Sequence, residues 1–267
     1  MEITKFISQD PIIILAFIAF FAGAIDSIAG GGGLITIPAL ILSGMPPLTV
    51  LGTNKLQSLF GSFSATIAYA HAGHVRIQQQ LFTAIMAFIG SILGALIATR
   101  LPSTFLQAIL PILLLLIAGY FTLKPQLDDK SKVQRLKPFI FSLIIAPLIG
   151  LYDGLFGPGT GSFYMLAFVS LVGHGILRAT AHTKLLNFAS NLGGFITFAM
   201  IGIIDFRIGI VMGIAQFLGA QCGARLAMYV GARLIKPILV ITCIILATKL
   251  LWDPQNPLQQ FYAKTLG

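Results

Sequence analysis

Apolar runs separated by short polar, proline or glycine connections occupy almost the whole chain. Eight of these runs are 18–21 residues long, the length that an α-helix needs to cross the hydrocarbon core of a membrane. Two further runs have only 10 and 11 residues. The pattern predicts an all-α polytopic membrane protein of eight to ten spans. The long runs are Pro11–Ala29, Leu51–Ala70, Leu81–Ala98, Phe105–Leu123, Phe139–Phe156, Lys184–Ile201, Ile208–Met228 and Ile235–Trp252, and the short ones are Leu34–Ser43 and Ser162–Val172.

The composition excludes a soluble domain. Hydrophobic residues make up 57% of the 267 residues and charged residues only 9%, whereas soluble domains have about 25% charged residues. The net charge of +9 is then better explained by lysine and arginine in cytoplasmic connections than by nucleic-acid binding, which we do not expect. Cys222 and Cys243 lie inside apolar runs and form no motif, so we interpret them as core residues.

A glycine-rich interruption follows the first long run. Four successive glycines, Gly30–Gly33, come shortly after a single carboxylate, Asp26. A similar arrangement returns in the second half, where Asp153 precedes the stretch Gly157–Gly161. A helix that breaks inside lipid leaves N–H and C=O groups unpaired, so such breaks persist only where protein or a watery cavity surrounds them. Matching breaks in two halves are typical of transport sites.

The two halves share an internal spacing. Asp26 and Asp153 are 127 residues apart, and after a slip of two residues the spacing becomes 129 and relates Lys55 to Lys184. We interpret this regularity as a duplication. The predicted organisation is a first transmembrane repeat (1–123), a cytoplasmic connecting loop (124–137), a second repeat (138–254) and a polar tail (255–267). The spacing of 127 also relates Gly30 to Gly157 and Gly32 to Gly159, and the spacing of 129 relates Gly73 to Gly202, Gly90 to Gly219 and Gly94 to Gly223.

Five segments in each half would place the halves in opposite orientations if every segment crosses the membrane. With the connecting loop inside, this arrangement puts 11 lysines and arginines inside and 6 outside. Re-entrant short segments would instead give parallel halves and a split of 10 to 7. The positive-inside rule therefore favours inverted repeats, in which the loops around Gln79 and Ile203 lie on opposite faces.

Asp26 and Asp153 are the only carboxylates inside apolar runs. A charge at the centre of a membrane helix costs about 2.5–3.5 kcal/mol, so both are candidates for carrying a coupling proton or cation. Capping of the broken helices is an equally good explanation.

The glycines between the helices can adopt φ > 0 and expose N–H groups to an anion where a helix resumes, at Leu34 and at Ser162. Close helix packing is the weaker explanation of these glycines. The substrate-binding candidates from the two turns are Gly30, Gly31, Gly32, Gly33, Gly157, Gly159, Thr160 and Gly161.

A lysine with polar residues after it recurs at equivalent positions. Lys55 and Lys184 are each predicted to open a span, where they can face an internal cavity or snorkel to the membrane surface. The polar residues that follow three and seven positions later favour the cavity. The further substrate-binding candidates are Asn54, Ser58, Thr183, Asn187 and Asn191.

Other reactive side chains give weaker indications. His71, His74 and His174 lie at segment ends, so we expect solvated histidines and no metal site. Ser162, with His174 or His182 as a base, would suit an intramembrane hydrolase, but the first half has no equivalent serine. No Walker motif is present, and no cofactor is expected.

The motifs at these positions resemble those of the sulfite exporter TauE/SafE family, also called the toluenesulfonate uptake permease family. The matching stretches are Gly23–Gly33, Gly52–Lys55, Asp153–Gly161 and His182–Lys184, and the likeness covers nearly the whole chain. The resemblance implies about eight spans, fewer than the ten obtained if both short segments cross.

The resemblance further implies a multi-pass secondary transporter of the bacterial inner membrane that is not an enzyme. Its partners would be the lipid bilayer, a small anion, which is a sulfur oxyanion or organosulfonate, and a coupling proton or sodium ion. An anion channel is the alternative among membrane proteins, and the intramembrane hydrolase is the alternative from another class.

Overall fold

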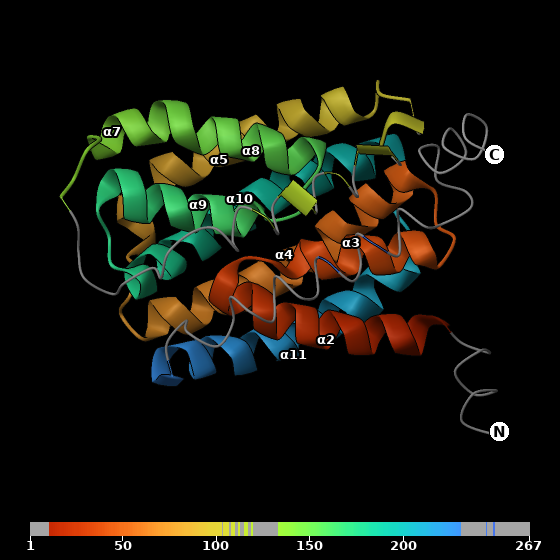
Figure 1. The fold of residues 1–267 in the computed structure, drawn as a ribbon, viewed down its shortest axis with the longest axis horizontal. Coiled ribbons are helices and arrows are strands. Elements are labelled where there is room, and N and C mark those ends of the chain that lie inside the picture. The colour runs from red at the N-terminus through yellow and green to blue at the C-terminus, as the bar shows by residue number, and fades with distance from the viewer. Residues whose placement is uncertain are drawn as a thin grey trace.

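The computed structural model describes residues 11–102 and 133–230, with some further positions between 104 and 119 and at 244 and 248. Every regular element in these residues is a helix, and the helices lie along one common axis (Figure 1). In chain order they are α2 (Pro11–Ala29), α3 (Gly32–Leu42), α4 (Pro47–His71), α5 (Ile77–Ala98), α7 (Pro138–Ile140), the π-helical turn η1 (Phe141–Ile145), α8 (Ala146–Leu155), α9 (Thr160–Ala167), the π-helical turn η2 (Phe168–Val172), α10 (Ile176–Ile201) and α11 (Phe206–Val230).

The helices agree with the predicted runs and differ mainly at their starts. α4 begins at Pro47, where a proline is favourable because its missing N–H would be unpaired anyway. α10 begins at Ile176, eight residues before the predicted Lys184. The expectation that Lys55 and Lys184 open their spans is therefore wrong, because each lies in the third turn of a longer helix.

Four helices in the described part of the chain are long and apolar enough to cross a membrane. They are Ile12–Ala29, Ile77–Ala98, Pro138–Leu155 and Phe206–Tyr229. α4 and α10 are longer, with 25 and 26 residues, but carry many buried polar side chains. Most of the predicted span Phe105–Leu123, nearly all of Ile235–Trp252 and most of the connecting loop 124–137 lie outside the described residues.

Each short helix runs back along the long helix that precedes it. The N–H groups of Arg135 and Leu136 donate to the carbonyl oxygen of Leu171 at 2.9 Å, so the end of η2 lies beside the start of α7. In the first half, Leu40 near the end of α3 packs in one apolar cluster with Leu15 near the start of α2. α2 and α8 run in opposite directions along the molecule (Figure 1).

The connections after α4 and α10 lie at opposite ends of these two helices. Val75, which follows α4, packs in one cluster with Ala181 near the start of α10. The N–H of Asp205, which follows α10, donates to the hydroxyl oxygen of Thr53 near the start of α4 at 3.0 Å.

Helices from different halves of the chain pack closely. α11 packs on α2, and α5 packs on α8, while α4 and α10 cross between these two pairs. A Cβ atom at Gly219 would collide with the carbonyl oxygen of Phe20, and one at Gly90 would collide with that of Pro147. Small residues permit this approach, which is how membrane helices associate where lipid removes the hydrophobic driving force.

Candidate functional site

The two helix breaks differ in length. The break between α2 and α3 has two residues, and the break between α8 and α9 has four. These two additional residues account for the change of the internal spacing from 127 to 129. Gly30, Gly157 and Gly159 have φ angles of +75°, +93° and +75°, so the chain needs glycine to turn at these positions.

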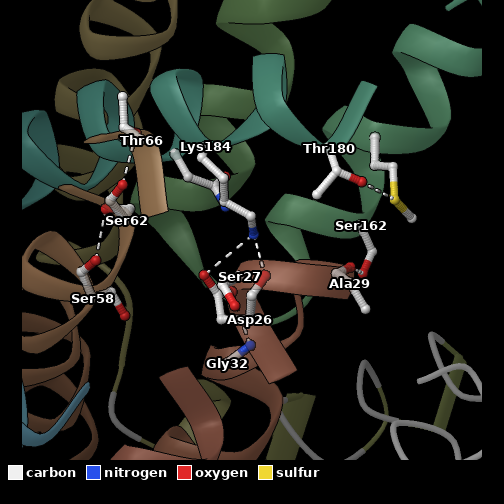
Figure 2. A network of polar contacts seen from close by, with 12 residues as sticks. Asp26, Ser27, Ala29, Gly32, Ser58, Ser62, Thr66, Ser162, Thr180 and Lys184 are labelled. Atoms are coloured by element: carbon white, nitrogen blue, oxygen red, sulfur yellow. Dashed lines mark hydrogen bonds and ion pairs between the residues drawn. The ribbon is translucent and has the colours of Figure 1, made fainter. Parts of the chain in front are cut away.

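The breaks contact each other. A Cβ atom at Gly30 would collide with the backbone of Gly161, and the N–H of Ser162 donates to the carbonyl oxygen of Gly30 at 3.2 Å. The Ser162 hydroxyl donates to the carbonyl oxygen of Ala29 at 2.6 Å (Figure 2). Because its proton is directed at a backbone carbonyl and not at a histidine, Ser162 lacks the geometry of an activated nucleophile.

Asp26 lies at the end of α2 and contacts two other helices (Figure 2). Its Oδ1 accepts a hydrogen bond from the N–H of Gly32, the first residue of α3, at 3.0 Å. Lys184 of α10 donates to the backbone carbonyl of Asp26 and lies 3.4 Å from its Oδ2. Asp26 therefore both caps α3 and forms an ion pair with a lysine from the other half.

Asp153 on α8 forms the second ion pair. Nζ of Lys55 on α4 lies 2.7 Å from its Oδ1. The hydroxyl of Thr160 donates to the same oxygen at 2.9 Å, and that of Ser190 donates to Oδ2 at 2.5 Å. Each predicted carboxylate is thus paired with the predicted lysine of the opposite half.

Burial decides between the two predicted placements of the lysines. The side chain of Lys55 is 1% exposed and that of Lys184 is 0% exposed. A snorkelling lysine keeps its ammonium group in water, so this alternative is excluded by the structure. Burial of four charged groups is costly, and the pairing of opposite charges offsets part of that cost.

A small polar cavity lies between the two breaks. Its volume is about 20 Å³, room for about one or two water molecules. Of the predicted binding residues, Gly31, Gly32, Lys55, Thr183 and Lys184 do not line it. The lining residues are Asp26, Gly30, Gly33, Asn54, Ser58, Asp153, Gly157, Gly159, Thr160, Gly161, Asn187 and Asn191.

Two helix N-termini face this cavity. α3 and α9 begin at Gly32 and Thr160, two residues before the predicted starts. The second residues of these helices, Gly33 and Gly161, both line the cavity. Their N–H groups make no backbone hydrogen bond to any described residue outside their own helix. A first-turn N–H has no acceptor within its helix, and the helix dipole adds positive potential there. Such a pair of N-termini attracts an anion.

Side-chain amides add hydrogen-bonding groups to the wall. Oδ1 of Asn54 accepts hydrogen bonds from the Thr36 hydroxyl at 2.7 Å and from Nε2 of Gln57 at 2.9 Å. Its amide group is thereby held in place, with Nδ2 near Gly33. Oδ1 of Asn187 is buried and has no hydrogen-bond partner among the described residues. The wall thus contains both a fixed amide and an unpaired acceptor.

Several polar residues of the site were not predicted from the sequence. Ser190 binds Asp153, and Thr36 and Gln57 orient Asn54. Ser190 lies one residue before the predicted Asn191, so its proximity to the polar stripe was the available signal. Thr36 lies in an apolar run and gave none.

The histidine expectation needs a correction at one position. His174 lies between η2 and α10 and stacks on Phe168, with ring centroids 5.6 Å apart. Its ring centroid is 4.7 Å from that of His182. Burial, together with the smaller effect of the positive charge of Arg178, lowers the pKa of His174 to about 4. His174 is therefore half-buried against aromatic rings and is not a fully solvated end residue.

The amino-acid sequence is similar to those of known proteins. A family model described as sulfite exporter TauE/SafE matches residues 15–250. The chain belongs to the sulfite exporter TauE/SafE family. The resemblance seen in the sequence motifs is thereby confirmed, since the match includes both breaks, both lysines and both carboxylates.

Relatives from bacteria support the assignment to this TauE/SafE family. A probable membrane transporter protein, ORF9, of Sinorhizobium sp is 58% identical over 249 residues, 92% of this chain and 95% of the relative. The probable membrane transporter protein YfcA of Escherichia coli K12 is 47% identical over 240 residues, 90% of this chain and 89% of the relative. A probable membrane transporter protein of Haemophilus influenzae is 43% identical over 247 residues, 92% and 97% of the two chains. No solved structure matches this TauE/SafE chain.

Proposed function

We propose that the protein is a secondary transporter that moves a small anion across the bacterial inner membrane. The observation that carries this proposal is the polar cavity between the N-termini of α3 and α9, deep among buried helices. A membrane helix that stops and restarts presents unpaired N–H groups, and a pair of such N-termini on one cavity suits an anionic substrate.

The charges around the cavity suit an anion that has to leave again. The two ammonium groups are neutralised by Asp26 and Asp153, so the site has no net charge from these four residues. Two unpaired lysines would bind an anion too firmly for turnover. In the ion pairs, the entering anion has to compete with the carboxylates of Asp26 and Asp153 for the lysines, which weakens its binding. The amides and hydroxyls of the cavity wall supply hydrogen-bond donors, while the two lysines lie behind the wall, each bound to its carboxylate.

A sulfur oxyanion or organosulfonate is the substrate class that we favour. The support is the description of the family, sulfite exporter TauE/SafE, whose model matches residues 15–250. Such anions are compact and have several acceptor oxygens, so one anion can accept hydrogen bonds from Gly33 and Gly161 together.

We further infer that the two halves are inverted repeats. Contacts between helices recur at the internal spacings: Gly23 on α2 lies against the backbone of Gln216, and Gly150 on α8 lies against that of Ala87. Gly23 and Gly150 are 127 residues apart, and Ala87 and Gln216 are 129 apart. The opposite directions of α2 and α8 support the same arrangement (Figure 1). Rocking of inverted halves about a shared site is the usual basis of alternating access.

Transport by purified protein in proteoliposomes tests the proposal. Uptake of radiolabelled sulfite, thiosulfate, sulfate and methanesulfonate is measured with and without an imposed pH or sodium gradient. We expect saturable, gradient-driven uptake of at least one anion, and loss of uptake in Asp26→Ala and Asp153→Ala. Asp205→Ala is the control, because this carboxylate accepts a hydrogen bond from Ile208 at the start of α11, away from the cavity. Flux that does not saturate and follows only the anion gradient would identify a channel instead.

A further inference from the structure

The two ion pairs hold their carboxylates differently. Asp153 is bound by three side chains, Lys55, Thr160 and Ser190, at 2.7, 2.9 and 2.5 Å. Both of its oxygens are occupied, and its side chain is 4% exposed. Among the described residues, Asp153 is the acceptor that pairs with the Lys55 ammonium group. Separation of this pair would therefore leave a buried ammonium group without a partner. This pair is built to stay together.

Asp26 is held by fewer groups. One backbone N–H, that of Gly32, donates to Oδ1, and Lys184 approaches Oδ2 only to 3.4 Å. The Asp26 side chain is 13% exposed and lines the cavity. Lys184 also donates to the backbone carbonyl of Asp26, and this bond remains if the carboxylate moves away (Figure 2). The Lys184 ammonium group can therefore exchange its carboxylate for another anion without losing all its partners.

Such an exchange changes the charge balance of the site. Two lysines and two carboxylates cancel, so an entering monoanion leaves the buried site with one net negative charge. A buried net charge is costly, and one proton on Asp26 removes it. The other titratable groups facing Asp26 are Lys184 from α10, Tyr69 from α4, whose hydroxyl donates to the neighbouring Ser27 carbonyl at 3.0 Å, and the Asp153–Lys55 pair across the cavity.

We propose that Asp26 is the exchangeable counter-ion of Lys184 and the group that couples anion binding to a proton. The entering anion replaces the Asp26 carboxylate beside the Lys184 ammonium group. Asp26 then takes one proton from a hydronium ion of the solvent: one O–H bond forms on the carboxylate, one O–H bond of the hydronium ion breaks, and a water molecule is released. Asp153 stays ionised and bound to Lys55. This division of roles rests on the proposed function and identifies its coupling group.

Proton uptake on binding tests the proposal. Binding of thiosulfate, sulfate, methanesulfonate and sulfite to the purified full chain is measured by calorimetry in buffers of different ionisation enthalpy. A titration of sulfite without protein measures the protonation of sulfite itself, and this contribution is subtracted from the binding data. We expect uptake of about one proton for each methanesulfonate bound and at least one for each dianion, and a methanesulfonate affinity that falls by up to tenfold for each unit of rising pH.

Asp26→Asn is the informative variant, because its amide oxygen can still accept from Gly32 while its neutral group imitates protonated Asp26. We expect anion binding with no proton uptake and no dependence on pH. Asp205→Asn is the matched control and should take up the proton as the unmodified protein does. Should Asp26→Asn not fold, infrared difference spectra of the unmodified protein must show a new protonated carboxyl band on anion binding.

The outcomes separate this inference from the proposed function. Binding without proton uptake, or uptake that persists in Asp26→Asn, overturns the coupling role of Asp26 and leaves anion transport standing. Absence of a protonated carboxyl band in the infrared spectrum has the same meaning. If none of the four anions binds to the unmodified protein, the proposed function fails and this inference fails with it.

Discussion

Removal of the Asp153 carboxylate should destabilise the protein strongly, because it leaves the Lys55 ammonium group buried and unpaired. Breaking a buried ion pair costs about 3–5 kcal/mol. Thr160 and Ser190 add little to this cost, since each hydroxyl also contacts a backbone carbonyl, that of Gly157 at 2.8 Å and that of Asn187 at 3.3 Å. The charge term therefore dominates the expected effect of Asp153→Leu.

A double substitution isolates that charge term. Lys55→Met alone leaves the Asp153 carboxylate buried with only the two hydroxyls, and should cost a similar amount. Lys55→Met combined with Asp153→Leu replaces the pair by apolar groups of similar volume, which is often neutral or stabilising. The double variant should therefore be more stable than either single variant, although it should not transport.

These differences in stability are measured by thermal unfolding in detergent, monitored by size-exclusion chromatography of samples heated to increasing temperatures. A cost of 3–5 kcal/mol corresponds to a decrease in Tm of roughly 6–20 °C. The Asp26–Lys184 pair offers the internal comparison: Asp26→Leu should lower Tm less, because Lys184 keeps its bond to the Asp26 carbonyl. Single variants within about 2 °C of the unmodified protein, or a double variant less stable than both singles, would refute the reasoning.

Two further predictions concern affinity and topology. Lys184→Gln should weaken anion binding by about 1.5–3 kcal/mol, roughly 10- to 150-fold, because a hydrogen bond to a charged group is lost. Isothermal titration measures this affinity, and Arg178→Gln, on the exposed start of α10, is the control. Unchanged affinity in Lys184→Gln would contradict the prediction. Single cysteines at Gln79 and Ile203, placed after replacement of the native cysteines, should differ in reaction with an impermeant thiol reagent on intact cells. Ile203 should be labelled and Gln79 should not, and labelling of neither before permeabilisation would rule out inverted repeats.

Much of the fold could be predicted because apolar length alone decides whether a helix can cross a membrane. The run Pro11–Ala29 coincides with α2, and the paired carboxylates and glycines located both breaks. The start of α10 was missed because Ile176–Thr183 contains arginine, histidine and threonines, which lower its hydropathy although most of its residues are buried by other helices. In a transporter core, burial by protein replaces burial by lipid, and hydropathy does not distinguish the two.

The partners within the site could not be predicted. Spacing relates Lys55 to Lys184 and Asp26 to Asp153, but it does not say that each lysine pairs with the carboxylate of the other half. That pairing results from the way α4 and α10 cross between the outer helix pairs, which is a property of long-range packing. The unequal support of the two carboxylates likewise depends on Ser190, whose counterpart at the spacing of 129 is Gly61.

Direct location of a bound anion tests the central claim, that a small anion binds between the two broken helices. Selenite is a heavier analogue of sulfite, and crystals grown with it can be measured at the selenium absorption edge. We predict an anomalous peak in the cavity, next to the N–H groups of Gly33 and Gly161 and within reach of Lys184. Selenium peaks found only outside this cavity, in protein that binds selenite in solution, would contradict the claim.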